Sequence, residues 1–152
     1  MIRILVDADA CPVKEEIYKV AFRHAVPVTI VSNSPIRVPA HALIDRVVVS
    51  DGFDAADDWI AERCEADVVC ITADILLADR CLKAGAIALA PNGKPFTTSS
   101  IGGAIATRAI MADLRAGAVG DPIGGPPPFS KTDRSRFLSA LDEMLMRLKR
   151  GR

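Results

Sequence analysis

I-R-I-L-V-D-A-D-A-C-P-V-K, residues 2–14, joins a short apolar run to two aspartates and a proline. Residues 2–6 are mostly branched apolar residues, as in a strand that is buried on both faces of a parallel sheet. Pro12 is favoured at the first position of a helix, so we expect a helix to begin there. The stretch therefore predicts the first half of a β-α unit, with Asp7 and Asp9 where the strand ends.

The same order of strand and helix repeats along the chain. Apolar, β-branched runs predict further strands at 26–31, 46–50, 67–72 and 86–90, with helical patterns between them, one of them at 54–64. This alternation favours an α/β fold with three layers, α/β/α, around a central parallel sheet of about five strands. The expected strand order is 3-2-1-4-5, which places the first strand beside the fourth.

After the fifth strand the chain is predicted to be mainly helical. One helix is expected over 99–116, a Gly/Pro-rich loop over 117–128, and a last helix from about Asp133. No repeat and no linker divides the chain, so we expect one domain over 1–152 with a C-terminal helical segment over 130–150. The apolar face of the last helix could pack on its own domain or on a second copy, so a homodimer is an open alternative.

Composition and charge limit the classes of function. The 152 residues are 50% hydrophobic and 25% charged with a formal net charge of zero, as in globular proteins. No apolar run has the length of a membrane span, and Arg3 interrupts any signal-peptide pattern, so we expect a cytoplasmic protein with no membrane partner. Residues 131–152 carry seven basic and three acidic side chains, and the rest of the chain is acidic overall. This balance argues against a general nucleic-acid binder, although the basic segment could contact phosphate.

The four cysteines, Cys11, Cys64, Cys70 and Cys81, form no C-x-x-C pair. Their spacing therefore predicts buried thiols rather than a zinc site. Cys11 differs from the others because it follows the acidic pair and precedes a helix. A helix N-terminus lowers the pKa of a thiol, so Cys11 is a candidate reactive thiol.

Carboxylates gather where the predicted strands end. The carboxyl ends of neighbouring parallel strands meet at one edge of a sheet, which is where ligands bind in open α/β sheets. Crowded carboxylates repel one another unless a proton or a cation lies between them, and hard oxygen ligands suit Mg²⁺ or Mn²⁺. The candidate metal ligands are Asp7, Asp9, Asp57, Asp58, Asp74 and Asp79. Four of them are also candidate catalytic residues, namely Asp7, Asp9, Asp58 and Asp74.

Some of these acids also fit purely structural roles. Asp54 with Asp57, and Asp74 alone, match the N-cap pattern of a helix, and Asp79 could be a solvated helix residue. The candidate substrate-binding residues are Lys14, Asn33, Thr72, Arg108 and Arg115. The three basic ones have the same ambiguity, since each could instead pair with a surface acid.

Three stretches, V-D-A-D-A-C-P-V-K, D-G-F-D-A-A-D-D-W-I and I-T-A-D-I-L-L-A-D, resemble the YaiI/YqxD family, as do G-G-P-P-P-F and D-R-x-x-F-L further on. The resemblance covers nearly the whole chain. It implies a bacterial protein with a PIN-like α/β/α fold and a metal-dependent nuclease site. In that site Asp7 or Asp9 would match the first acid, Asp57 or Asp58 the helical acid, and Asp74 the acid after the fourth strand. Asp79 would be an outer ligand.

Three functions follow as expectations. The first is a Mg²⁺- or Mn²⁺-dependent nuclease or phosphodiesterase that acts on RNA or on a small phosphoester. The second is a haloacid-dehalogenase-like phosphatase, with Asp7 as nucleophile and Asp9 as general acid. The third is a non-catalytic nucleotide- or RNA-binding module in which the acids only cap helices.

Overall fold

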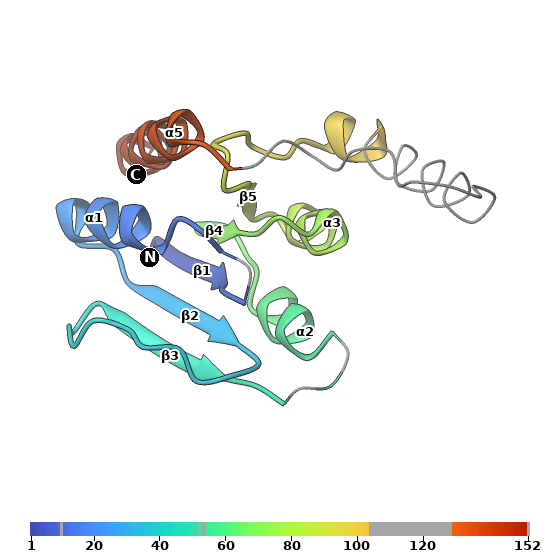
Figure 1. The fold of residues 1–152 in the computed structure, drawn as a ribbon. Coiled ribbons are helices and arrows are strands. Elements are labelled where there is room, and N and C mark those ends of the chain that lie inside the picture. The colour runs from blue at the N-terminus through green and yellow to red at the C-terminus, as the bar shows by residue number, and fades with distance from the viewer. Residues whose placement is uncertain (10, 51, 53, 104–128, 152) are drawn as a thin grey trace, which may run out of the picture.

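The computed structural model describes residues 1–9, 11–50, 52, 54–103 and 129–151. Its five strands form one parallel sheet with the order β3-β2-β1-β4-β5, which confirms the predicted order (Figure 1). The strands are β1 (Arg3–Asp7), β2 (Val28–Ser32), β3 (Ile44–Val48), β4 (Val68–Ile71) and β5 (Ile87–Leu89). The helices are α1 (Lys14–His24), α2 (Ala55–Glu62), α3 (Ile75–Lys83) and α5 (Lys131–Arg150).

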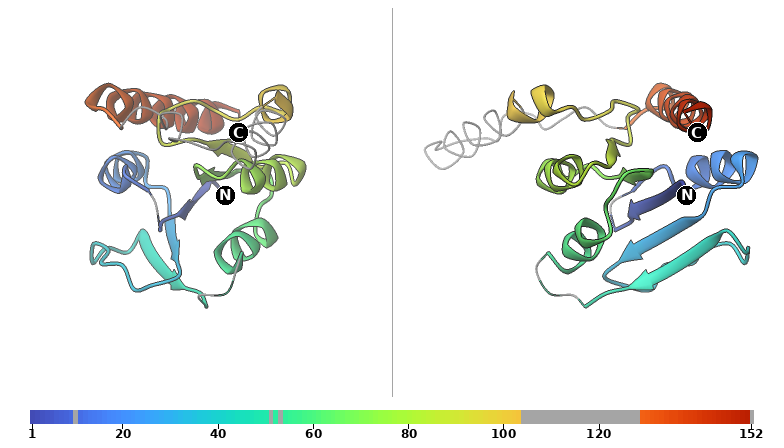
Figure 2. Two further views of the ribbon diagram at one scale, coloured as in Figure 1. Left: turned by 45° about the vertical axis from the view of Figure 1, so that its right-hand side comes forward. Right: turned by 180° about the vertical axis from the view of Figure 1, so that it is seen from behind.

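The helices cover both faces of the sheet, as a three-layer α/β/α fold requires (Figures 1 and 2). α1 and α5 lie together on one face, and α2 and α3 lie on the other. The central strand β1 serves both layers, because successive side chains of a strand point to opposite faces. Ile4 and Val6 pack in the cluster under α1 and α5, whereas Leu5 packs in the cluster under α2 and α3.

α5 packs along α1 with its apolar face. Phe137, Leu141 and Leu145 are fully buried in the same cluster as the α1 side chains. Asp142, on the flank of this contact, accepts hydrogen bonds from His24 Nε2 (2.7 Å) and from Arg23 (3.2 Å). The chain therefore covers this face of α5 itself, and a homodimer stays a prediction.

Two expectations about element boundaries are wrong. β3 begins two residues before the predicted 46–50, because its parallel pairing with β2 starts where Ile44 lies opposite Val28. It lies at the edge of the sheet, as the expected strand order places it, and its residues are mostly exposed although its β-branched composition is typical of a buried strand. α1 begins at Lys14, because Pro12 lies in the preceding turn.

Two predicted helices belong to the C-terminal part of the chain. The helix expected over 99–116 begins at Thr98, and residues 104–116 lie outside the described residues. The last helix, α5, begins with a capping box in which Ser130 and Asp133 exchange hydrogen bonds. Neither this helix nor any other in the described ranges is long and apolar enough to cross a membrane.

A tight turn joins β5 to the segment that approaches α5. The N–H of Gly93 donates to the carbonyl of Ala90 (2.9 Å), and the N–H of Ala90 donates to the carbonyl of Lys94 (3.0 Å). Gly93 has φ +88°, and a Cβ atom there would lie 2.7 Å from the backbone carbon of Arg136. Glycine therefore serves here both for the left-handed backbone and for the close approach to α5.

Candidate active site

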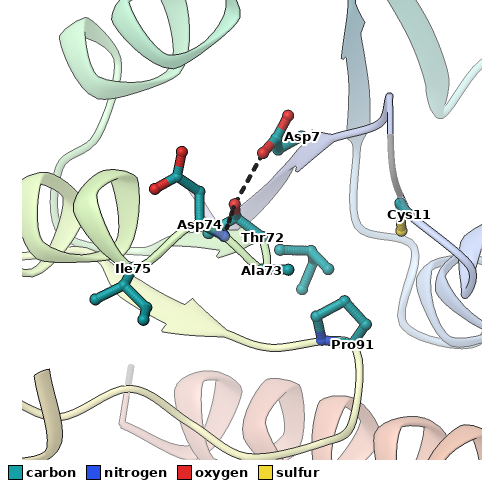
Figure 3. Close-up of a pocket in the computed structure, with 8 residues that line it drawn as sticks. Asp7, Cys11, Thr72, Ala73, Asp74, Ile75 and Pro91 are labelled. Carbon is teal, nitrogen blue, oxygen red and sulfur yellow. Dashed lines mark hydrogen bonds between the residues drawn. The ribbon is translucent and has the colours of Figure 1, made fainter. Parts of the chain in front are cut away.

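A cavity of about 460 Å³ opens at the carboxyl ends of β1 and β4, the two neighbouring strands at the centre of the sheet. Val6 pairs with Ile71, so the residues that come after them, Asp7 and Thr72, leave the sheet side by side. Figure 3 shows the carboxylates of Asp7 and Asp74 on the same side of this cavity. The lining residues are Asp7, Cys11, Ile71, Thr72, Ala73, Asp74, Ile75 and Pro91.

Thr72 ties the two strand ends together. Its buried hydroxyl donates a hydrogen bond to Oδ2 of Asp7 (2.9 Å) and accepts one from the backbone N–H of Asp74 (3.0 Å). A threonine at this position thus fixes the Asp7 carboxylate and the start of the next turn at once. Burial raises the pKa of Asp7, the Thr72 hydrogen bond lowers it, and the charges of Asp74 and Asp9 raise it. The pKa of Asp7 lies above its usual value on balance.

Asp74 is the N-cap of α3, in agreement with one of the two roles that its place in the sequence suggested. Its Oδ1 accepts from the N–H of Leu76 (2.9 Å) and from the N–H of Leu77 (3.4 Å). Both capping bonds go to the same oxygen, so this role holds the carboxylate in place and leaves Oδ2 outside the cap. The cap and a place at the cavity are therefore compatible.

Asp57, in the first turn of α2, completes a group of three carboxylates. Burial, the negative charges of Asp74 and Asp7, and a hydrogen bond with Asp74 together raise the pKa of Asp57 to about 7. Two of these causes require the three acids to lie close to one another. Asp7, Asp57 and Asp74 come from β1, α2 and the β4–α3 junction, and we call them the carboxylate group.

The other candidate acids have partners of their own. Both oxygens of Asp9 accept from the backbone N–H of Asn33 (2.9 and 3.2 Å), which ties the loop after β1 to the end of β2. Asp58 forms an ion pair with Arg80 (2.8 Å), and Asp79 forms one with Lys83 (2.8 Å). Asp54 precedes α2 with φ +64° but makes no side-chain capping bond. Asp54 is thus the N-cap residue by position, as the sequence suggested, but its side chain does not cap the helix.

Of the candidate substrate-binding residues, two form hydrogen bonds within loops and one lines the cavity. Lys14 donates to the carbonyl of Cys11 (3.0 Å), and the side-chain amide of Asn33 donates to the carbonyl of Ser50 (2.8 Å). Both therefore stabilise loops at the sheet edge, whereas Thr72 lines the cavity. Arg108 and Arg115 lie outside the described residues.

Cys11 lines the cavity, and the pKa of its thiol is raised rather than lowered. It is buried, and burial raises its pKa, while Lys14 lowers the pKa by less. The expectation of a lowered pKa is wrong, because the side chain is desolvated and α1 begins three residues later, at Lys14. Cys64 and Cys81 form a thiol–thiol hydrogen bond of 3.0 Å away from this cavity, and all four cysteines are free.

The carboxylate group could supply only part of the ligand shell of a metal ion, and not a site built wholly from protein ligands. Within the described part of the chain, no three acidic, histidine or cysteine side chains are arranged around one point as a ready-made metal cage. Mg²⁺ is often held by one or two carboxylates and completes its shell with water and substrate phosphates. Burial raises the pKa of Asp57 most, and repulsion from Asp74 and Asp7 raises it further; a bound divalent cation would relieve that repulsion. Carboxylate oxygens of this kind are ligands that Mg²⁺ and Mn²⁺ prefer.

A second cavity adjoins the first and contains residues that the sequence did not suggest as site residues. It has a volume of about 720 Å³ and shares Ala73, Ile75 and Pro91 with the first cavity. Its other walls include Lys94, Phe96, Phe129 and Arg136. The signal in the sequence is the combination of basic and aromatic residues in N-G-K-P-F, a stretch that is otherwise typical of a turn.

The sequence profile described as the uncharacterised YaiI/YqxD family matches residues 5–147. A UPF0178 protein of Sphingopyxis alaskensis is 74% identical over 97% of this chain and 96% of its own length. UPF0178 proteins of Rhodopseudomonas palustris strain TIE-1 and of Azorhizobium caulinodans are 61% and 60% identical, over 99% of this chain and 94% and 93% of their lengths. No solved structure matches the chain.

Proposed function

For this chain, which belongs to the YaiI/YqxD family, we propose a divalent-metal-dependent phosphodiesterase activity directed at RNA. The observation that carries the proposal is the convergence of Asp7, Asp57 and Asp74 beside a cavity at the centre of the sheet edge. Open α/β sheets bind their ligands at this edge, and the cavity is large enough for a small phosphoester group.

The roles of the three acids follow from their surroundings. Asp7 and Asp74 would hold Mg²⁺ or Mn²⁺, since Thr72 and the helix cap fix their positions before any ligand binds. Such an ion, when bound, activates water and stabilises the leaving oxygen of a phosphodiester. Asp57 has a pKa near neutrality, so its carboxyl group could take or give a proton near pH 7. We therefore assign the helical acid to Asp57 rather than to Asp58, whose carboxylate is paired with Arg80.

The phosphatase alternative is less well supported. It needs the carboxyl group of Asp9 beside Asp7 as a general acid. Both oxygens of Asp9 instead accept from the N–H of Asn33, at the end of a different strand. The non-catalytic alternative has no such difficulty, because Asp74 does cap α3, and only a measurement of metal binding separates it from the proposal.

The test is calorimetric titration of Mn²⁺ into the wild-type protein and into Asp74→Asn and Asp57→Asn. Asparagine is also a good N-cap, so Asp74→Asn should keep α3 intact while it removes the charge. We expect Mn²⁺ binding to weaken by about tenfold or more in each variant, since each loses a charged group of the site. In parallel, Mn²⁺-dependent cleavage of a single-stranded RNA should be lost in both.

Asp58→Asn is the matched control, because it removes the neighbouring carboxylate on the same turn of α2. It should leave Mn²⁺ affinity and RNA cleavage close to the wild-type values. Equal Mn²⁺ affinity in the wild type, Asp57→Asn and Asp74→Asn would contradict the proposal, as would RNA cleavage that persists in excess EDTA.

A further inference from the structure

The cavity that adjoins the carboxylate group combines aromatic and cationic side chains from separate parts of the chain. Lys94 and Phe96 come after the turn that ends β5, Phe129 precedes α5, and Arg136 lies in the second turn of α5. We propose that this cavity is a nucleotide subsite, which binds one unpaired nucleotide of a single strand by its base and its phosphate. The inference rests on the proposed function for its choice of ligand and deepens it by naming the substrate class.

The walls of the cavity are held by the fold. The N–H of Phe96 donates to the carbonyl of Ala88 (2.9 Å), and Pro95 pairs with Leu89, so this segment extends the edge of the sheet. The turn at Gly93 rests directly on the backbone of Arg136. Lys94 and Arg136 are thereby brought to one rim from positions far apart in the sequence. A subsite needs such pre-organised walls to bind a small ligand without a large entropic cost.

The charges at this rim are available to an anion. In the described part of the chain, the side chains of Lys94 and Arg136 form no ion pair and no hydrogen bond with another residue. Asp133 also lines this cavity, and its carboxylate accepts hydrogen bonds from Ser130 in the capping box. The hydrogen bonds with Ser130 lower the pKa of Asp133 most, and the charges of Arg136 and Lys94 lower it further. A phosphate at the rim would meet the two positive charges of Lys94 and Arg136, which outnumber the one negative charge of Asp133.

The aromatic residues give the cavity a surface for a base. Phe96 and Phe129 are partly buried, and the guanidinium of Arg134 covers the ring of Phe129 at 5.1 Å. Stacking of a base on an aromatic ring contributes about 1–3 kcal/mol and tolerates different sequences. A paired base is stacked inside its duplex and cannot enter a cavity. The ligand is therefore a nucleotide of a single strand.

The second cavity lies directly beside the cavity of the carboxylate group. The two cavities share the wall formed by Ala73, Ile75 and Pro91, and Figure 3 shows Ile75 and Pro91 on the far side of the first cavity from Asp7. The first cavity has the carboxylates of Asp7 and Asp74, and the second has two cations, two phenylalanines and Asp133. A strand with one phosphate in the first cavity could place its neighbouring nucleotide in the second cavity.

The test is an NMR titration of the metal-free protein with AMP, and separately with inorganic phosphate, in the presence of EDTA. We expect AMP to saturate with shifts at residues 94–100 and at Phe129 and Arg136. Inorganic phosphate should bind at least about fivefold more weakly, because it lacks the base. The double variant Lys94→Gln/Arg136→Gln should weaken AMP binding by about tenfold or more, as expected for two charge-assisted phosphate contacts.

Two further variants complete the design. Arg147→Gln removes an exposed arginine of the same helix that pairs with Glu143, and it should leave AMP affinity within about twofold of the wild type. Phe96→Leu keeps apolar volume but loses the ring, so it should weaken AMP binding and leave phosphate binding unchanged. Thermal melting of each variant establishes that it is folded.

The subsite is overturned if AMP does not saturate at millimolar concentration, if AMP and phosphate bind equally, or if the double variant binds AMP as the wild type does. Asp74→Asn should still bind AMP in EDTA. If the wild-type protein binds AMP but neither binds Mn²⁺ nor cleaves RNA, the result counts against the proposed function alone. Retained Mn²⁺-dependent cleavage without AMP binding would count against the subsite alone.

Discussion

The hydroxyl of Thr72 donates a 2.9 Å hydrogen bond to Oδ2 of Asp7, a residue that lies 65 positions earlier in the chain. Because Thr72 also accepts from the backbone N–H of Asp74, one small side chain sets the spacing of two of the three acids. A valine has nearly the shape of threonine but neither donates nor accepts, so it isolates this role.

Thr72→Val should raise the pKa of Asp7 further, because the Thr72 hydrogen bond lowers it in the wild type. The variant should also lose about 1–2 kcal/mol of unfolding free energy, since it leaves two polar groups without their partner. Carbon-detected NMR titration in EDTA and urea unfolding measure the two effects. Thr72→Ser keeps the hydroxyl and should remain close to the wild type in pKa. Equal Asp7 pKa values in the valine and serine variants would show that the bond is unimportant.

The raised pKa of Asp57, about 7, makes stability depend on pH in the metal-free protein. Between about pH 4 and 7 the folded state holds a proton that the unfolded chain has released, so the free energy of unfolding falls as pH rises through this window. Asp57→Asn should remove this contribution and should be more stable than the wild type at pH 8 by about 1 kcal/mol, once solvent screening is allowed for. Urea unfolding at pH 5 and pH 8 in EDTA measures it.

Asp58→Asn serves as the control for this pH effect. It removes a carboxylate from the same turn but breaks only the exposed ion pair with Arg80. The fall in stability between pH 5 and pH 8 should persist in this variant. A fall of the same size in Asp57→Asn would mean that another group causes it.

Gly93→Ala should destabilise the protein by about 2–4 kcal/mol, through backbone strain and through steric overlap with α5. The residue has φ +88°, and a Cβ would lie 2.7 Å from Arg136. Gly85→Ala is a matched control, because Gly85 also has φ +88° but its added Cβ would meet no atom closer than 4.0 Å. It should cost only about 1 kcal/mol, the strain alone. Urea unfolding of both variants measures the difference, and equal losses would refute the role of the α5 contact.

Asp142→Asn should weaken the contact between α5 and α1 by about 0.5–1 kcal/mol at neutral pH. The His24 hydrogen bond, more than any other contact, lowers the pKa of Asp142, so its stabilisation is present above the unfolded pKa and is lost as pH falls through the folded one. The difference between variant and wild type should therefore vanish in acid. Glu143→Gln is the control, since Glu143 pairs with Arg147 within α5. Chemical unfolding at pH 7 and in acid checks both points.

The strand order and the meeting of Asp7 with Asp74 could be predicted from the sequence. Both follow from the alternation of strand and helix and from the rule that ligand sites form at the carboxyl ends of parallel strands. The choice between Asp57 and Asp58 could not be predicted in this way. It depends on the rotation of α2 about its axis, which the left-handed backbone at Asp54 fixes just before the first turn.

The second cavity could not be predicted for a different reason. Lys94 and Arg136 share a rim only because Gly93 permits a turn to rest on α5, a contact between distant segments that no local pattern reveals. The exposure of β3 is a different case, because the predicted strand order places it at an edge of the sheet while its β-branched composition is typical of a buried strand.

The packing of α5 on α1 also bears on how the chain is made. Synthesis proceeds from the N-terminus, so α1 and its apolar residues leave the ribosome long before Phe137, Leu141 and Leu145 can cover them. The sheet can pair its strands during that interval, but one of its faces stays partly open to water and to other nascent chains. This face therefore stays prone to aggregation until α5 emerges, and the core is complete only when the last helix has packed.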